Sequence, residues 1–202
     1  MRSSPARTSF LLVLVAAAAL AAGCGDSATV TQPPAATALG RFGLTAVNSP
    51  DSMYTTQWQG KVLCLVFISP YCPHCKLAAP SLQDSIWSVY QSRGVQLVAV
   101  AVTVGYPDSD LVGYADSAHV SFPVCRCNAS LRERIGVPYI PFVALVDRQG
   151  LLVYQDTATA SLISDADVSA LRRRLDSMLA GTAAGSAPPA APGRGLPVCP
   201  FP

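Results

Sequence analysis

The chain is short of charge: Asp, Glu, Lys and Arg make up only 13% of its 202 residues. It contains no basic cluster of the kind that holds a nucleic-acid backbone, and without Arg2 and Arg7 its basic and acidic residues are equal in number. The run Arg172–Arg174 falls mostly on the polar side of a predicted helix, where such runs are ordinary solvated surface. Nucleic-acid binding and a polybasic membrane tether are therefore excluded.

Metal-ligand patterns are also scarce. The chain has two histidines, and Cys-x-x-Cys occurs once, at Cys72–Cys75. A four-ligand zinc site usually needs a second pair of cysteines or histidines at a suitable spacing. Cys125-Arg126-Cys127 is the one candidate for that second pair, so the sequence predicts no metal site.

Long hydrophobic runs are missing except near the start of the chain. Basic residues precede the apolar run Phe10–Ala22, which is too short to span a bilayer but suits the core of a signal peptide. Leu-Ala-Ala-Gly-Cys at 20–24 resembles the bacterial lipobox, whose cysteine becomes the lipidated first residue. We predict a lipoprotein signal peptide at 1–23 and lipidation of Cys24; ordinary cleavage, which leaves Cys24 as a thiol, is the alternative. Either route predicts a protein outside the cytoplasm, and lipidation predicts a membrane-anchored lipoprotein of the periplasm or cell envelope.

Composition divides the rest of the chain into three parts. Residues 24–40 are rich in Ala, Thr, Pro and Gly and are expected to form a flexible spacer. Residues 41–180 are expected to form one domain with a substantial core. Residues 181–202 are again low in complexity and are expected to be disordered, with Cys199 near their end.

Between these tails, apolar patterns predict alternating strands and helices. Strands are expected at 62–68, 95–104, 142–146 and 151–154, and helices at 73–92, 108–119, 128–135 and 165–179. The apolar stripe of the first helix is assigned to Leu77, Leu82, Ile86, Val89 and Tyr90. This order of elements predicts an α/β sandwich with a mixed sheet.

Cys72-Pro73-His74-Cys75 joins the first predicted strand to the first predicted helix. The sulfur of Cys72 then faces the unsatisfied N–H groups and the positive dipole end of that helix. Cysteines so placed have pKa values of roughly 3.5–7.5 instead of about 8.5. We therefore predict Cys72 as an exposed nucleophile and Cys75 as the more buried resolving thiol. Pro73 suits the first helical position, and His74 adds a donor or cation that stabilises the thiolate and makes the disulfide more oxidising.

Three other interpretations of this pair are weaker. A structural disulfide between residues this close would constrain little chain and stabilise little. Half of a zinc site would need the second ligand pair discussed above. Two ordinary core cysteines are disfavoured by the Pro-His context at a helix start. Redox chemistry is the favoured use.

Several separated motifs resemble the thioredoxin superfamily, and within it the TlpA/ResA-like group of extracytoplasmic thiol–disulfide proteins. They are Gly60-Lys61, Cys72 and Cys75, Pro80, Phe122-Pro123-Val124, Gly136–Phe142 and Asp147–Gly150, in the order and spacing of that group. The resemblance covers roughly residues 40–180. It implies a thioredoxin-like three-layer α/β/α sandwich with a mixed central β-sheet, and a cis peptide between Ile140 and Pro141. Such a bond leaves backbone groups available to pair with an extended substrate, so Ile140 and Pro141 are predicted to bind substrate.

The chain also departs from the group. Val66 occupies the place of a buried acid or amide that assists proton transfer, Tyr71 that of a tryptophan, and Ile140 that of a threonine. The Pro-His dipeptide is the one found in strongly oxidising DsbA-type proteins. The direction of electron flow therefore stays open among reductant of apocytochrome c thiols, general oxidant and isomerase.

The predicted function is extracytoplasmic thiol–disulfide exchange with protein substrates. The Cys72–Cys75 pair would carry the electrons without a dissociable cofactor, and a membrane partner would reset it. One alternative is a copper-binding chaperone-type module, since thiolates with a histidine such as His119 suit Cu(I). The other is a peroxiredoxin-like peroxidase, because Ser69 lies three residues before Cys72, although Leu65 stands where that family has a proline.

The remaining cysteines are assigned minor roles. Cys64 falls inside a predicted core strand and is expected to be an inert thiol. Cys125 and Cys127 are favoured as structural, but three other uses stay open. A strained, easily reduced bridge between them could relay electrons to Cys72–Cys75, the two thiols could bind a soft metal with His119, or they could bond elsewhere.

Overall fold

The sheet is organised around strand β4 (Val62–Ile68), an apolar segment that is buried along its whole length. The computed structural model describes residues 37–50, 52–155 and 164–181, all of which belong to the compact unit Pro33–Pro202. β4 pairs in parallel with β5 (Val95–Ala101) and antiparallel with β7 (Phe142–Val146). A strand buried on both faces reads as a continuous apolar run, which is why the sequence located β4 and β7 to the residue.

Three shorter strands complete a six-stranded mixed sheet of order β1-β8-β7-β4-β5-β6. They are β1 (Thr37–Ala38), β6 (Val124–Cys125) and β8 (Leu151–Gln155). β1 pairs antiparallel with β8, and Leu39 after it is 1% exposed. The sheet therefore starts inside the range expected to be spacer.

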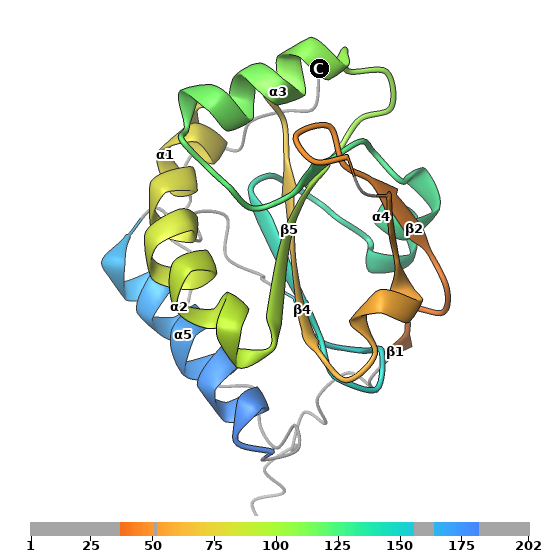
Figure 1. Cartoon of the computed structure of the whole chain (residues 1–202), viewed down its shortest axis with the longest axis vertical. Coiled ribbons are helices and arrows are strands. Elements are labelled where there is room, and N and C mark those ends of the chain that lie inside the picture. Colours follow the sequence, from red (N-terminus) through yellow and green to blue (C-terminus); the bar gives the residue numbers. More distant parts are fainter. Residues whose placement is uncertain (1–36, 51, 156–163, 182–202) are drawn as a thin grey trace, which may run out of the picture. The chain divides into compact units, whose positions relative to one another are not determined.

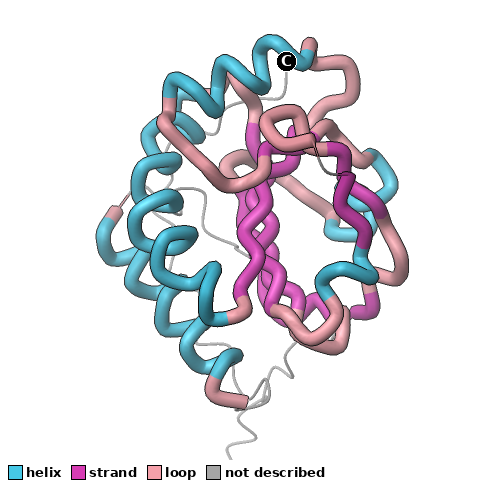
Figure 2. Tube along the Cα trace, viewed as in Figure 1, coloured by secondary structure: helices cyan, strands magenta, loops and turns pink. Residues whose placement is uncertain are grey.

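Helices cover both faces of the sheet, as Figures 1 and 2 show. On one face lie the segment from α1 (Pro73–Ser81) to α2 (Ser88–Tyr90) and helix α5 (Asp165–Leu179), tied together by the Tyr90 hydroxyl, which donates to the Arg172 carbonyl at 3.3 Å. The other face carries α4 (Ala129–Ile135) and a hairpin of β2 (Gly43–Thr45) and β3 (Ser52–Tyr54). Helix α3 (Asp108–Ser117) lies across the end of the sheet where α1 begins. The fold is the predicted three-layer α/β/α sandwich.

The first predicted helix is continuous but irregular. After Pro80 the chain passes through the π-turn η2 (Leu82–Trp87), then α2 and the 3₁₀ turn η3 (Gln91–Arg93), and ends at Gly94 with φ 90°. A proline inside a helix removes one N–H donor and crowds the preceding turn, which accounts for the irregularity.

The predicted apolar stripe of this helix is partly wrong. Ile86 and Tyr90 are buried as expected, but Leu77 is 63% exposed and Val89 37% exposed. Leu77 lies five residues before Leu82, so a helix places the two about 140° apart, and Leu77 faces solvent. The second predicted strand is also too long, because β5 ends at Ala101.

The hairpin β2–β3 and the turn η1 (Thr55–Trp58) that follows it were not predicted. Their strands have three residues each, too few to produce a periodic pattern. The hairpin joins the edge of the main sheet through a bridge between Ala46 and Cys125.

Within the described parts of the chain, no helix has the length and apolar character needed to cross a bilayer. The predicted leader 1–23, Cys24 and Cys199 lie outside the described residues.

Candidate active site

Cys72 is the N-cap residue of α1, and its sulfur accepts a hydrogen bond from the backbone N–H of Cys75 at 3.4 Å. Its φ and ψ of −78° and 115° are extended, and Pro73 takes the first helical position as predicted. The chain reaches this point directly from the end of β4, with the Cys72 N–H donating to the Ser69 carbonyl at 3.2 Å. An N–H donor at a helix start stabilises negative charge on an acceptor. The geometry therefore favours a thiolate at Cys72.

The exposure predicted for Cys72 is wrong. Cys72 is 3% exposed and Cys75 is 1% exposed, and both belong to the same apolar core cluster as Tyr139 and Ile140. The Cys72 sulfur is therefore covered by residues of that core cluster. A protein partner must displace part of this cover to reach Cys72.

The Ile140–Pro141 peptide is cis, as the resemblance implied. Pro141 immediately precedes β7, whose first residue, Phe142, pairs with Phe67 near the end of β4. The loop of Ile140 and Pro141 is therefore at the same end of the sheet as the start of α1. Both residues are buried.

Ser69 is the buried polar residue of this end of the sheet, at 2% exposed. Its hydroxyl accepts hydrogen bonds from the Tyr106 hydroxyl at 3.0 Å and from the Tyr71 N–H at 3.3 Å. The rings of Tyr71 and Tyr106 meet edge to face with centroids 5.5 Å apart, and the Tyr71 hydroxyl donates to Asp110 on α3. Ser69 therefore organises the aromatic residues beside the dithiol, a role that the sequence comparison with peroxiredoxins did not suggest.

Tyr114 on α3 was missed from the sequence. It is 2% exposed, and its hydroxyl donates to the Cys75 carbonyl at 3.2 Å. Burial first, and then the charges of Cys75 and Cys72, raise the pKa of Tyr114 above its ordinary value. The one indication of this role in the sequence was that Tyr114 lies in the predicted helix 108–119, between the predicted strand 95–104 and Phe122-Pro123.

Val66, at the place of the expected acid, is fully buried in β4 and offers no polar group. The protonated hydroxyl of Tyr114 can donate a hydrogen bond to the turn of the dithiol but cannot take a proton at neutral pH. Proton transfer to and from the dithiol therefore cannot use a buried acid at position 66. His74, beside the dithiol, is half-buried, and its role remains a prediction.

The other described cysteines are thiols, and no bridge joins Cys125 to Cys127. Burial raises the pKa of Cys64 and of Cys125 to about 12. The Cys127 thiol donates to the Val102 carbonyl at 3.5 Å, and burial raises its pKa as well, opposed by Arg132. These are the features of structural thiols.

The described residues contain no group of three or more His, Cys, Asp or Glu side chains that could hold a metal ion. His119, the spare ligand considered for copper, is exposed and has a φ of 50°. Among the residues that the structure describes, the ligand set that the copper alternative needs is therefore not assembled.

Comparisons with known proteins find one relative in sequence and several in fold. The chain is 26% identical over 122 residues to the thiol-disulfide oxidoreductase ResA of Halalkalibacterium halodurans, a match that covers 57% of this chain and 68% of ResA. Its fold matches a thiol:disulfide interchange protein DsbE of Chlorobium tepidum, with a TM-score of 0.60, 21% identity and coverage of 71% and 96% of the two chains. It also matches a secreted disulfide oxidoreductase of Mycobacterium tuberculosis, with a TM-score of 0.55, 20% identity and coverage of 67% and 95%.

No family model matches the chain. The structural neighbours establish a thioredoxin-like fold, and the match to ResA adds a similarity in sequence. On these grounds the chain has a thioredoxin-like fold and is similar in sequence to a ResA thiol–disulfide oxidoreductase.

Proposed function

We propose that this protein exchanges electrons with thiols and disulfides of protein substrates outside the cytoplasm, held at a membrane by lipid on Cys24. The observation that carries the proposal is the hydrogen bond from the Cys75 N–H to the Cys72 sulfur at the start of α1. This hydrogen bond stabilises negative charge on the Cys72 sulfur, which both a nucleophilic thiolate and a good leaving group require.

In the reducing direction the Cys72 thiolate attacks one sulfur of a substrate disulfide. A Cys72–substrate bond forms, and the other substrate sulfur leaves as a thiolate. Cys75 then loses its proton and attacks the Cys72 sulfur, which closes the Cys72–Cys75 disulfide and releases the second substrate thiolate. Two electrons pass from the dithiol to the substrate, and the oxidising direction is the reverse.

The pair itself stores the electrons, so the exchange needs no dissociable cofactor, and a membrane redox partner resets it. Ile140 and Pro141 are the proposed backbone contacts for an extended substrate segment, supported by their place at the same end of the sheet as Cys72. His74 is proposed to stabilise the thiolate. The reduction potential of the pair decides the direction: a value near −270 mV indicates a reductant and one near −120 mV an oxidant.

The test is insulin reduction and thiol oxidation by the chain from Cys24 onward, with Cys24→Ser to remove the acyl site. Cys72→Ser is expected to reduce both activities to the background rate, and Cys75→Ser is expected to trap a mixed disulfide at Cys72. Cys125→Ser and Cys127→Ser are the matched controls and should retain activity. Full activity of Cys72→Ser would contradict the proposal. Loss of activity in either control would support the electron relay from Cys125 and Cys127 to Cys72–Cys75.

A further inference from the structure

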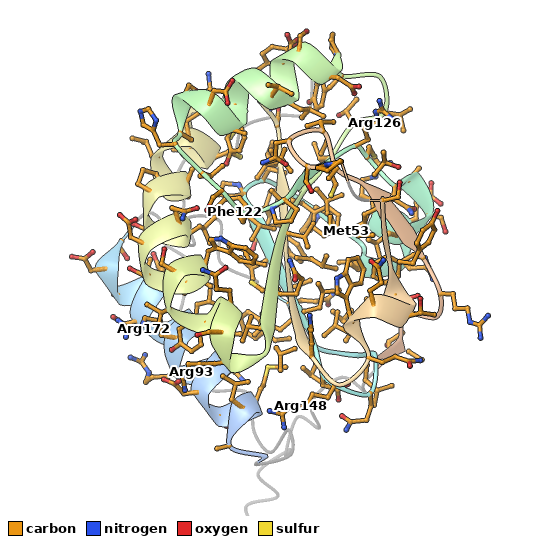
Figure 3. All side chains as sticks on the ribbon, viewed as in Figure 1. Met53, Arg93, Phe122, Arg126, Arg148 and Arg172 are labelled. Carbon is orange, nitrogen blue, oxygen red and sulfur yellow. The ribbon has the colours of Figure 1, made fainter. Side chains whose placement is uncertain are left out.

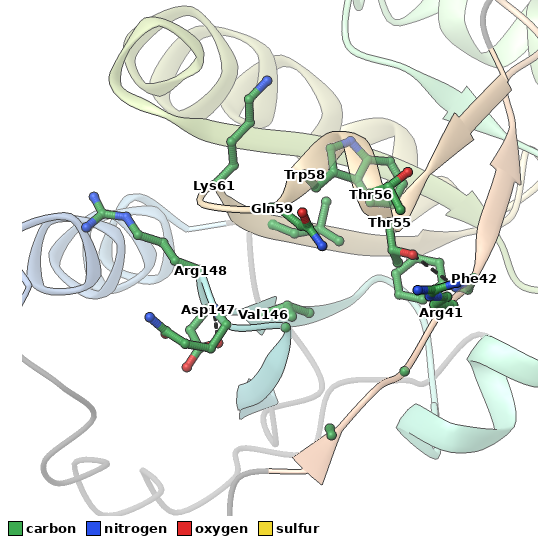
Figure 4. A pocket seen from close by; sticks show the side chains of 15 residues that line it. Arg41, Phe42, Thr55, Thr56, Trp58, Gln59, Lys61, Val146, Asp147 and Arg148 are labelled. Atoms are coloured by element: carbon green, nitrogen blue, oxygen red, sulfur yellow. Dashed lines mark hydrogen bonds between the residues drawn. The ribbon is translucent and has the colours of Figure 1, made fainter.

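A pocket of about 250 Å³ lies at the end of the sheet opposite the dithiol. Its apolar lining comes from buried side chains on four different segments: Phe42, Trp58, Leu63 and Val146. Three exposed basic side chains, Arg41, Lys61 and Arg148, stand around it (Figure 4). Leu63 is at the start of β4, whereas α1 follows the end of that strand, so the length of β4, about 20 Å, separates the pocket from the dithiol.

We propose that this pocket and its basic residues form a docking surface for the phosphate headgroups of anionic phospholipids. The inference rests on the proposed lipid anchoring and adds to it a defined orientation on the membrane. The fold brings together basic residues that are far apart in sequence, which is why no polybasic segment was visible.

The basic residues around the pocket are not neutralised by acids within the described part of the chain. The ion pairs found there are Arg93–Asp176 and Arg126–Asp108, and neither contributes to the pocket. Asp147 is the acid among the lining residues, and its Oδ1 already accepts hydrogen bonds from the backbone N–H groups of Gln149 and Leu151, both at 2.9 Å. This end of the domain therefore presents an excess of positive charge.

A fourth cation lies next to the pocket. The guanidinium of Arg134 is 5.8 Å from the centroid of the Phe42 ring and donates to the Leu39 carbonyl. An anionic surface attracts each nearby Lys or Arg by about 1 kcal/mol.

The opposite end of the domain is unsuited to an anionic surface. Helix α3 carries Asp108, Asp110 and Asp116 and has no basic residue. Arg126, which pairs with Asp108, and Arg148 lie at opposite ends of the domain in Figure 3. This asymmetry of charge directs the pocket end, and not the dithiol end, toward anionic lipid.

The path of the chain agrees with this orientation. Ala38 and Gly40 line the pocket and belong to the first residues that the structure describes. The segment from Cys24 to Thr37 can reach at most about 45 Å when fully extended. An acyl group on Cys24 would therefore hold the pocket end within reach of the bilayer. The dithiol would face away from the membrane, toward soluble substrates. A membrane partner that resets the dithiol would therefore need a domain that extends from the bilayer as far as Cys72.

Sedimentation with vesicles tests this inference, using the chain from Cys24 onward with Cys24→Ser so that no acyl group contributes. We expect binding to phosphatidylglycerol-rich vesicles, weakened by salt, and no binding to pure phosphatidylcholine. The triple variant Arg41→Gln/Lys61→Gln/Arg148→Gln should bind on the order of 100-fold more weakly, since each cation contributes about fivefold. The matched control, with the same change of charge, is Arg172→Gln/Arg173→Gln/Arg174→Gln on α5, which should change binding by less than about fivefold.

Equal losses in the two triple variants, or equal binding to both vesicle types, would overturn the docking surface. Binding of inorganic phosphate at the pocket without binding to anionic vesicles would also overturn it, in favour of a small soluble anion. Both triple variants should keep the insulin-reduction activity in solution. Because that assay contains no membrane, its outcome separates a failure of the docking surface from a failure of the proposed function.

Discussion

The hydroxyl of Tyr114 on α3 donates a 3.2 Å hydrogen bond to the carbonyl oxygen of Cys75 on α1. This contact joins the helix inserted after β5 to the first turn of the dithiol helix, whose Cys75 N–H holds the Cys72 sulfur. Since burial and the nearby thiols raise the pKa of Tyr114, the phenol stays protonated and remains a donor. We regard Tyr114 as a positioning residue of the dithiol.

Tyr114→Phe removes this hydrogen bond and leaves the ring. We expect the free energy of unfolding to fall by about 1–2 kcal/mol, as for a buried carbonyl that loses its donor, and the reduction potential of Cys72–Cys75 to shift. Tyr90→Phe is the matched control, because Tyr90 is also buried and donates to a backbone carbonyl, that of Arg172. Tyr90→Phe should lower the free energy of unfolding in urea by a similar amount and leave the reduction potential of Cys72–Cys75 unchanged. Equal potentials in the two variants would reduce Tyr114 to a structural role.

Val66 leads to a second prediction. Val66→Asp places a carboxyl at the position where the thioredoxin resemblance predicts a buried acid or amide, and we expect the release of a mixed disulfide by Cys75 to become at least about tenfold faster. The buried carboxyl should also lower the free energy of unfolding by about 1–3 kcal/mol. Rapid-quench analysis of the mixed disulfide measures the rate. Val66→Thr has nearly the same shape and no proton acceptor of this kind, so an equal acceleration there would refute the explanation.

The fold was predictable from the sequence wherever a segment is long and buried on both sides. β4, β7 and α5 were predicted to the residue, because burial of every side chain, or of one helical stripe with caps, leaves a strong pattern. The hairpin β2–β3 was not predictable, since its three-residue strands pair through the backbone and carry too few side chains to form a pattern.

Of the candidate site, only the Cys-x-x-Cys pair and the proline after Ile140 were predictable from the sequence. The spacing of Cys72 and Cys75 and the proline after Ile140 are local features that a sequence displays directly. The Tyr114 contact and the Ser69 network depend on α3 and the loop before it folding back across the end of the sheet, and contacts between residues tens of positions apart leave no local signal.

The thiols of Cys64 and Cys125 predict how stability depends on pH. Burial raises the pKa of each from 9.0 to about 12. The unfolded chain therefore loses these protons first, so the folded state should lose stability as the pH rises above about 9, by about 3 kcal/mol per thiol up to about pH 11. Below pH 8 these thiols should have no effect on the slope. Urea unfolding at several pH values measures it.

Cys64→Ala and Cys125→Ala provide the controls for that measurement. Each should lower stability at pH 7, because a buried sulfur is removed, yet each should make stability less dependent on pH between 9 and 11. A slope identical to that of the unsubstituted chain would show that these thiols do not govern the alkaline loss of stability.

Stabilisation of the Cys72 thiolate by the start of α1 is tested by the pH profile of Cys72 alkylation by iodoacetamide, read by peptide mass spectrometry in the Cys75→Ala variant. This variant keeps the backbone N–H that donates to the Cys72 sulfur. We expect a midpoint well below the value of about 8.5 for an ordinary cysteine, and a return to that value when the chain is unfolded in urea. A folded-state midpoint at or above about 8.5 would mean that the start of α1 does not stabilise the thiolate, and the proposed exchange chemistry would lose its physical basis.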